Sequence, residues 1–186
     1  MFKTHPLHPA LVHFPISFLT ATHTIDILHY LTTSLSLPIL TPFLTPHLAQ
    51  LLPASRLLHT LGIATALPAA LSGILQAAQQ LSNPANAYES DGKTFKRKFL
   101  VMFTHAALMD TVVAVSGMVW WWRFKEGGVW GLDNGGDGGV PSGWDIGLGA
   151  VVVPVMFYGA SLGADLVYKF GMGFSAGSSS QDRKRK

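Results

Sequence analysis

The 186-residue chain contains no cysteine. Disulfides, thiolate metal sites and cysteine nucleophiles are therefore excluded. Charged side chains are also scarce, because they make up 12% of the residues, about half of the usual globular share of about 25%. A water-soluble domain of this length needs a larger charged surface. The shortage of charge indicates a chain that is solvated largely by lipid.

Long apolar stretches take the place of the missing charges. Hydrophobic residues make up 48% of the chain and the mean hydropathy is +0.32. About 20 apolar residues suffice to cross a bilayer, and stretches of this length lie at residues 9–32, 57–81, 99–122 and 146–168. We therefore expect an all-α fold, an integral membrane four-helix bundle that forms a single domain over residues 5–174, with a disordered basic tail at 175–186.

Two connecting segments have compositions that disfavour a spanning helix. The linker between the first two spans has prolines at positions 38, 42, 46 and 53, too many for a regular membrane helix. We expect it to lie along the membrane surface, with a short helix near residues 46–52. The glycine-rich segment 127–139 is expected to be a flexible loop.

The distribution of basic residues predicts the orientation in the membrane. Four spans place both termini and the second loop on one side, which holds ten of the 13 lysines and arginines. The other three are Arg56, Arg123 and Lys125. Because cytosolic loops carry the excess of positive charge, both termini are predicted to be cytosolic. The pattern does not distinguish the endoplasmic reticulum from the plasma membrane.

Polar side chains recur at matched depths on the termini side of the bundle. At 1.5 Å of rise per residue, His13 lies about 6 Å and His105 about 9 Å below that face. Asp165 and Tyr168 approach the same face from the last span, and His5 and His8 lie on the loop just outside it. We expect His13, His105 and Asp165 to form an inner site.

A second polar set lies towards the opposite face. This second set comprises His23 and Asp26 on the first span and His59 at the start of the second, and Asp110 lies near mid-membrane between the two sets. A mid-membrane aspartate costs about 2.5–3.5 kcal/mol on insertion scales, so such groups normally face the bundle interior and pair with one another. We expect this set to be a weaker, secondary polar cluster.

These groups have three possible roles. As hydrogen-bonding residues they fix helix packing, and this is our first interpretation, with no catalytic residue and no enzymatic activity expected. Alternatively, His13 and His105 are the axial ligands of a b-type haem, with Asp165 and Tyr168 beside it and a redox partner outside. A transition metal held by His5, His8, His13 and His105 is a variant of that idea.

A proton relay through the histidines is the third role. Proton-coupled transport is disfavoured because four spans offer a narrow pathway, unless a homo-oligomer forms through the small-residue face of Gly159 and Gly163. Beyond such a second copy, the expected partner is the lipid bilayer. A nucleic-acid partner is not expected, because the basic cluster of the tail is short and lies beside a span.

Three motifs resemble the family of predicted membrane proteins called domain of unknown function 2231. They are "HPLHPALVHFPISFL" at 5–19, "THAALMD" at 104–110 and "GASLGADLVYKFGMGF" at 159–174. The resemblance implies a four-helix membrane domain but no established activity. Some members occur beside redox modules, which favours the haem alternative. This chain departs from the family pattern at Asp110, where many members have Asn, and at Phe170, where a His is common.

Overall fold

The computed structural model describes residues 7–39, 41–127 and 140–172. Helices account for nearly all of this part of the chain, and it holds no strand, only an isolated bridge between Tyr88 and Phe95. The elements in order are α1 (Leu7–Leu11), α2 (His13–Thr33), α3 (Thr41–Leu44), the 3-10 turn η1 (Thr45–His47), α4 (Leu48–Leu81), α5 (Pro84–Ala87), α6 (Arg97–Gly127) and α7 (Gly143–Tyr168).

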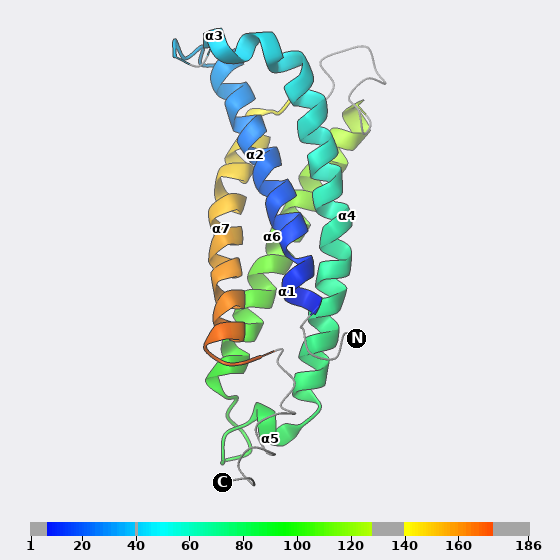
Figure 1. Cartoon of the computed structure of the whole chain (residues 1–186), viewed down its shortest axis with the longest axis vertical. Coiled ribbons are helices and arrows are strands. Elements are labelled where there is room, and N and C mark those ends of the chain that lie inside the picture. The colour runs from blue at the N-terminus through cyan, green and yellow to red at the C-terminus, as the bar shows by residue number, and fades with distance from the viewer. Residues whose placement is uncertain (1–6, 40, 128–139, 173–186) are drawn as a thin grey trace, which may run out of the picture.

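Four long helices lie side by side in an elongated bundle, with α3 at one end and α5 at the other (Figure 1). α2 packs against α4 and α7, and α6 packs against the same two helices, so α2 and α6 are diagonal to each other. The four candidate spans are Leu7–Thr33, Thr41–Leu81, Arg97–Lys125 and Gly143–Tyr168. The prediction of an all-α integral membrane bundle is confirmed.

The inward faces of all four helices repeat with alternating steps of three and four residues. On α2 the buried series is Pro15, Leu19, Thr22, Asp26, His29. On α4 it is Ser55, His59, Gly62, Ala66, Ala69. On α6 it includes Val112, Ser116, Val119, Arg123, and on α7 it is Gly149, Val152, Met156, Gly159. A mean spacing of 3.5 residues is the signature of left-handed bundle packing at a shallow crossing angle.

An apolar layer occupies the middle of the bundle and separates its two polar ends. Leu19, Val112, Val152 and Met156 form this layer, and all four are buried. α4 contributes Gly62, where a Cβ would lie 2.7 Å from Leu19 Cδ2. Because lipid tails are as apolar as these side chains, van der Waals contact rather than the hydrophobic effect holds such a layer together in a bilayer.

A second apolar cluster closes the α5 end of the bundle. It is built on Phe99, Met102 and Leu166, with the Tyr88 ring stacked on Phe95 at 4.6 Å between ring centres. Asp91 organises the adjoining turn. Hydrogen bonds from the Thr94 hydroxyl, and then from the Thr94 and Lys93 backbone N–H groups, lower the pKa of the Asp91 carboxyl below its ordinary value.

The linker between the first two spans is more helical than its prolines indicated. α4 begins at Leu48 rather than at residue 57, and it includes Pro53 and Pro68. Pro53 lies near the start of α4. The backbone hydrogen bond that a proline cannot donate is therefore lost near the helix end and not in its middle. The expectations for the glycine-rich loop, from residue 128 to residue 139, and for the tail at 175–186 fall on residues outside the described ranges.

Candidate functional site

A buried ion pair joins the two diagonal helices near the α3 end. Arg123 Nη1 on α6 donates to Asp26 Oδ2 on α2 at 2.7 Å, and both side chains are 5% exposed. Arg123 Nη2 donates to Asp26 Oδ1 at 3.3 Å, and Ser55 Oγ on α4 donates to the same oxygen. Three helices therefore converge on one carboxylate, and burial of both charges makes their mutual contact necessary.

Two buried histidines lie beside this ion pair. The ring centres of His23 and His59 are 6.0 Å apart, and the two residues are 3% and 1% exposed. His59 Nε2 donates to the backbone oxygen of Ser116 at 3.0 Å. α7 reaches the His23 ring through Gly149, where a Cβ would lie 2.6 Å from His23 Nδ1. We call Asp26, Arg123, Ser55, His23 and His59 the ion-pair cluster.

The ion-pair cluster contains three of the four residues that were expected to form the secondary polar cluster. His23, Asp26 and His59 do come together, whereas Asp110 is exposed on α6. Sequence reasoning missed Arg123 and counted it only among the basic residues on the side opposite the termini. The signal that finds it is the inward series of α6, in which Arg123 stands four residues after Val119.

A second histidine pair lies at the opposite side of the apolar layer. The rings of His8 on α1 and His105 on α6 are 6.3 Å apart between centres, at an interplanar angle of 79°. His8 Nδ1 donates to the backbone oxygen of Ala69 on α4 at 2.9 Å. His105 Nδ1 donates to the backbone oxygen of Gly159 on α7 at 2.8 Å. Each ring is thus fixed by a backbone carbonyl of a neighbouring helix.

Glycines bring the neighbouring backbones against these two rings. A Cβ at Gly73 would lie 2.9 Å from His8 Cε1, and a Cβ at Gly163 would lie 2.9 Å from His105 Cε1. Gly159 is buried as well, and a Cβ there would lie 2.8 Å from Met109 Sδ. The small-residue face of α7 that was expected to meet a second copy is therefore occupied by α6 of the same protomer.

The inner site differs from its prediction in its members. His13 is exposed, and the ring that lies beside His105 is that of His8. A separation of five positions turns a helix by about 140°, so the two histidines face different directions. The alternating steps of three and four residues in the inward series of α2 can be extended from Pro15 towards the N-terminus. They lead to position 12 and then to position 8, so this spacing would have predicted that His8 faces the bundle interior.

The other residues expected at the inner site lie at the surface or outside the described ranges. Asp165 accepts a hydrogen bond from Lys169 Nζ at 2.7 Å, and Tyr168 is 85% exposed. His5 is not among the described residues. Within the described part of the chain, no three His, Asp or Glu side chains gather as a group that could hold a metal ion.

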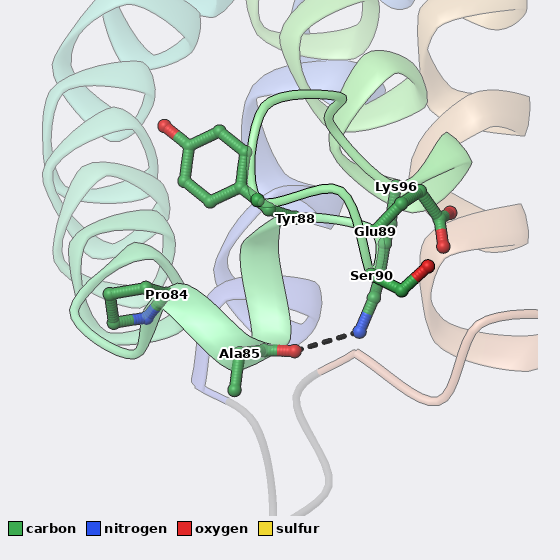
Figure 2. Close-up of a pocket in the computed structure, with 7 residues that line it drawn as sticks. Pro84, Ala85, Tyr88, Glu89, Ser90 and Lys96 are labelled. Atoms are coloured by element: carbon green, nitrogen blue, oxygen red, sulfur yellow. Dashed lines mark hydrogen bonds between the residues drawn. The ribbon is translucent and has the colours of Figure 1, made fainter.

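A shallow pocket of about 650 Å³ lies apart from both histidine pairs, at the loop after α5 (Figure 2). Pro84, Tyr88, Glu89 and Lys96 are among the residues that line it. Figure 2 shows the Lys96 side chain reaching down to the Ala85 carbonyl, to which its Nζ donates at 2.7 Å. None of the residues expected to form a site lines this pocket.

The fold and its buried polar groups define the protein as an integral membrane four-helix bundle with a histidine pair on each side of an apolar layer. The family model described as "Predicted membrane protein (DUF2231)" matches residues 4–176, and the chain belongs to this family. No curated protein and no solved structure significantly matches the chain.

Proposed function

We propose that His8 and His105 are the two axial ligands of a b-type haem in a membrane redox protein. The observation that carries the proposal is the matched bonding of the two rings. Both donate through Nδ1 to a backbone carbonyl, which leaves Nε2 of each ring as the ligand nitrogen. Ligating histidines almost always donate their other ring nitrogen in this way.

The spacing of the rings also supports the proposal. Two imidazoles that bind one iron from opposite sides hold their ring centres roughly 6 Å apart, because each iron–nitrogen bond is about 2 Å and each ring centre lies about 1 Å further on. The observed separation is 6.3 Å. Gly73 and Gly163 are the kind of small residue that a flat slot beside the ligands needs.

The chain's own residues would set the properties of this site. The Ala69 and Gly159 carbonyls fix the tautomer of each ring and increase the basicity of its other nitrogen. A bound haem supplies one-electron transfer. Because His8 and His105 lie on the termini side of the apolar layer, we propose that electrons enter and leave at that face, through a redox partner.

The test is a dithionite-reduced minus oxidised visible spectrum of protein purified in detergent after expression with ample haem. Sharp α and Soret bands that disappear in both His8→Ala and His105→Ala are expected. His13→Ala is the matched control, since this exposed histidine lies five residues from His8, and it should keep the bands. A flat wild-type spectrum would rule the haem out, and bands that depend on His13 would rule out His8 as a ligand.

The ion-pair cluster supports a second role, that of fixing helix packing. Its central carboxylate accepts hydrogen bonds from Arg123 on α6 and from Ser55 on α4, so α2, α4 and α6 share one polar contact. His59 also donates through Nε2 to the α6 backbone. If the spectrum is flat, we propose that the His8–His105 pair has this packing role too.

A further inference from the structure

Asp110 lies near the middle of a spanning helix and is exposed there. The candidate span on α6 runs from Arg97 to Lys125, which places Asp110 within about 2 Å of its midpoint along the helix axis. No hydrogen bond or ion pair of Asp110 is found within the described residues. A carboxyl group at mid-membrane is expensive unless it meets a partner.

Several threonine hydroxyls of the spans are satisfied within their own helices. The hydroxyls of Thr24, Thr65, Thr104 and Thr111 each donate to a carbonyl of the preceding turn. The remaining acidic residues of the described spans are also engaged, since Asp26 pairs with Arg123, Asp145 forms a capping box and Asp165 pairs with Lys169. Among the acidic residues of the described spans, Asp110 is therefore the one with no hydrogen-bond or ion-pair partner.

The residues around Asp110 allow another helix to approach closely. Ala106 and Ala114 stand one turn before and one turn after it on the same face, and both are exposed. Gly117 continues this face, and a Cβ there would meet nothing within 4 Å. Small residues that flank a polar one are typical of contacts between membrane helices. We call Ala106, Asp110, Thr111, Ala114 and Gly117 the Asp110 face.

We infer that the Asp110 face of α6 is the contact surface for a second copy of this chain. Two copies inserted with the same orientation are related by a twofold axis along the membrane normal, so that each Asp110 meets the other copy at its own depth. Thr111 Oγ1 donates its hydrogen to the Ala107 carbonyl. The lone pairs of this hydroxyl oxygen remain available to accept a hydrogen bond from a carboxyl group of the other copy. Carboxyl–carboxyl or carboxyl–hydroxyl bonds across the axis then satisfy both copies without any other protein.

Disulfide cross-linking in native membranes tests this contact, because the chain has no cysteine of its own. Ala106→Cys and Ala114→Cys should each give a cross-linked dimer as the main species under copper phenanthroline. Leu71→Cys, an exposed position on α4, is the matched control and should stay monomeric. Equal cross-linking from Leu71→Cys, or none from the α6 positions, would overturn the proposed face.

A second measurement separates the role of Asp110 from the packing of the alanines. Single-molecule photobleaching in liposomes should show dimers for the wild type and for Asp110→Asn, which keeps a hydrogen-bonding side chain at this position. Asp110→Leu should shift the population to monomers by tenfold or more at equal protein density. Since Asp110 is exposed and has no hydrogen-bond or ion-pair partner within the described residues, Asp110→Leu should keep the wild-type melting temperature in detergent. Dimers that persist unchanged in Asp110→Leu would refute the inference.

Discussion

Arg123 and Asp26 meet across the diagonal of the bundle, with 2.7 Å between Nη1 and Oδ2. Their helices, α6 and α2, are separated by α4 and α7, so this contact is one of the few that spans the bundle interior directly. Ser55 on α4 joins the same carboxylate. The pair therefore sets how three helices are positioned at the α3 end.

Removal of one partner from this ion pair should strongly destabilise the protein. Asp26→Leu or Arg123→Leu leaves a buried charge uncompensated, and each is expected to lower the free energy of unfolding by about 3–5 kcal/mol. The double variant should recover most of that loss, because neither charge of the pair is then left buried without the other. A double-mutant cycle from SDS titrations of the purified protein measures the coupling, and purely additive losses would contradict this account.

The exposed pair of Asp165 and Lys169 is the matched control for that cycle. These residues form an i, i+4 pair at 2.7 Å with side chains that are 37% and 67% exposed. Pairs of this kind contribute about 0–1 kcal/mol. Asp165→Ala should therefore change the free energy of unfolding by less than about 1 kcal/mol.

Close backbone approach in the apolar layer makes Gly62 sensitive to the smallest substitution. A Cβ at this position would lie 2.7 Å from Leu19 Cδ2, so that Leu19 must leave its rotamer or the helices must part. We expect Gly62→Ala to lower the free energy of unfolding by about 1–3 kcal/mol. Gly147→Ala on α7, where a Cβ meets nothing within 4 Å, should be neutral or slightly stabilising, and equal losses at the two positions would contradict the packing.

Glycine at position 163 should matter for the His8–His105 pair as well as for packing. A Cβ there lies 2.9 Å from His105 Cε1, and the ring must rotate away from the Gly159 carbonyl to avoid it. Gly163→Ala should therefore weaken any reduced-minus-oxidised haem bands, while Gly147→Ala leaves them intact. Haem content per protein, from a pyridine haemochrome assay, is the measurement that decides.

The predicted orientation is open to direct labelling, because single cysteines can be introduced into a cysteine-free chain. Both termini are predicted to be cytosolic, which places Ser90 in the cytosol and Ser34 on the opposite side. In sealed membrane vesicles with the cytosolic face outward, an impermeant maleimide should label Ser90→Cys and should label Ser34→Cys only after the membrane is permeabilised. Both residues are exposed, so the reverse pattern would invert the topology.

The turn at Asp91 should depend on its ionised carboxylate. The pKa of Asp91 is lowered by the hydrogen bonds that it accepts from Thr94 and Lys93. A lowered pKa in the folded state stabilises the turn above the unfolded pKa, and this contribution is lost as the pH falls through the lowered value. Asp91→Ala should reduce the hydrogen-exchange protection of the Thr94 amide at neutral pH. Unchanged protection would show that the turn does not need the carboxylate.

Some features of this protein follow from the sequence alone. Four apolar stretches of sufficient length predict the bundle, because hydropathy and the rise of a helix are local properties of the chain. Depth follows from the same rise, and for this reason His23, Asp26 and His59 could be grouped correctly. The inward series at steps of three and four residues is also present in the sequence, and it distinguishes His8 from His13.

Other features depend on how the helices rotate and pack against one another. Residue counting gives the depth of Arg123 but not its partner, because Asp26 is on a helix that does not adjoin α6. Gly159 and Gly163 have the composition of an oligomer contact, yet α6 occupies their face within the protomer. Asp110 is left outside for the same reason, since the α6 residues that pack into the apolar layer are Met109, Val112 and Val115. The sequence determines which groups share a depth, and the tertiary structure decides which of them face one another, because rotation about each helix axis is set by contacts between residues distant in the chain.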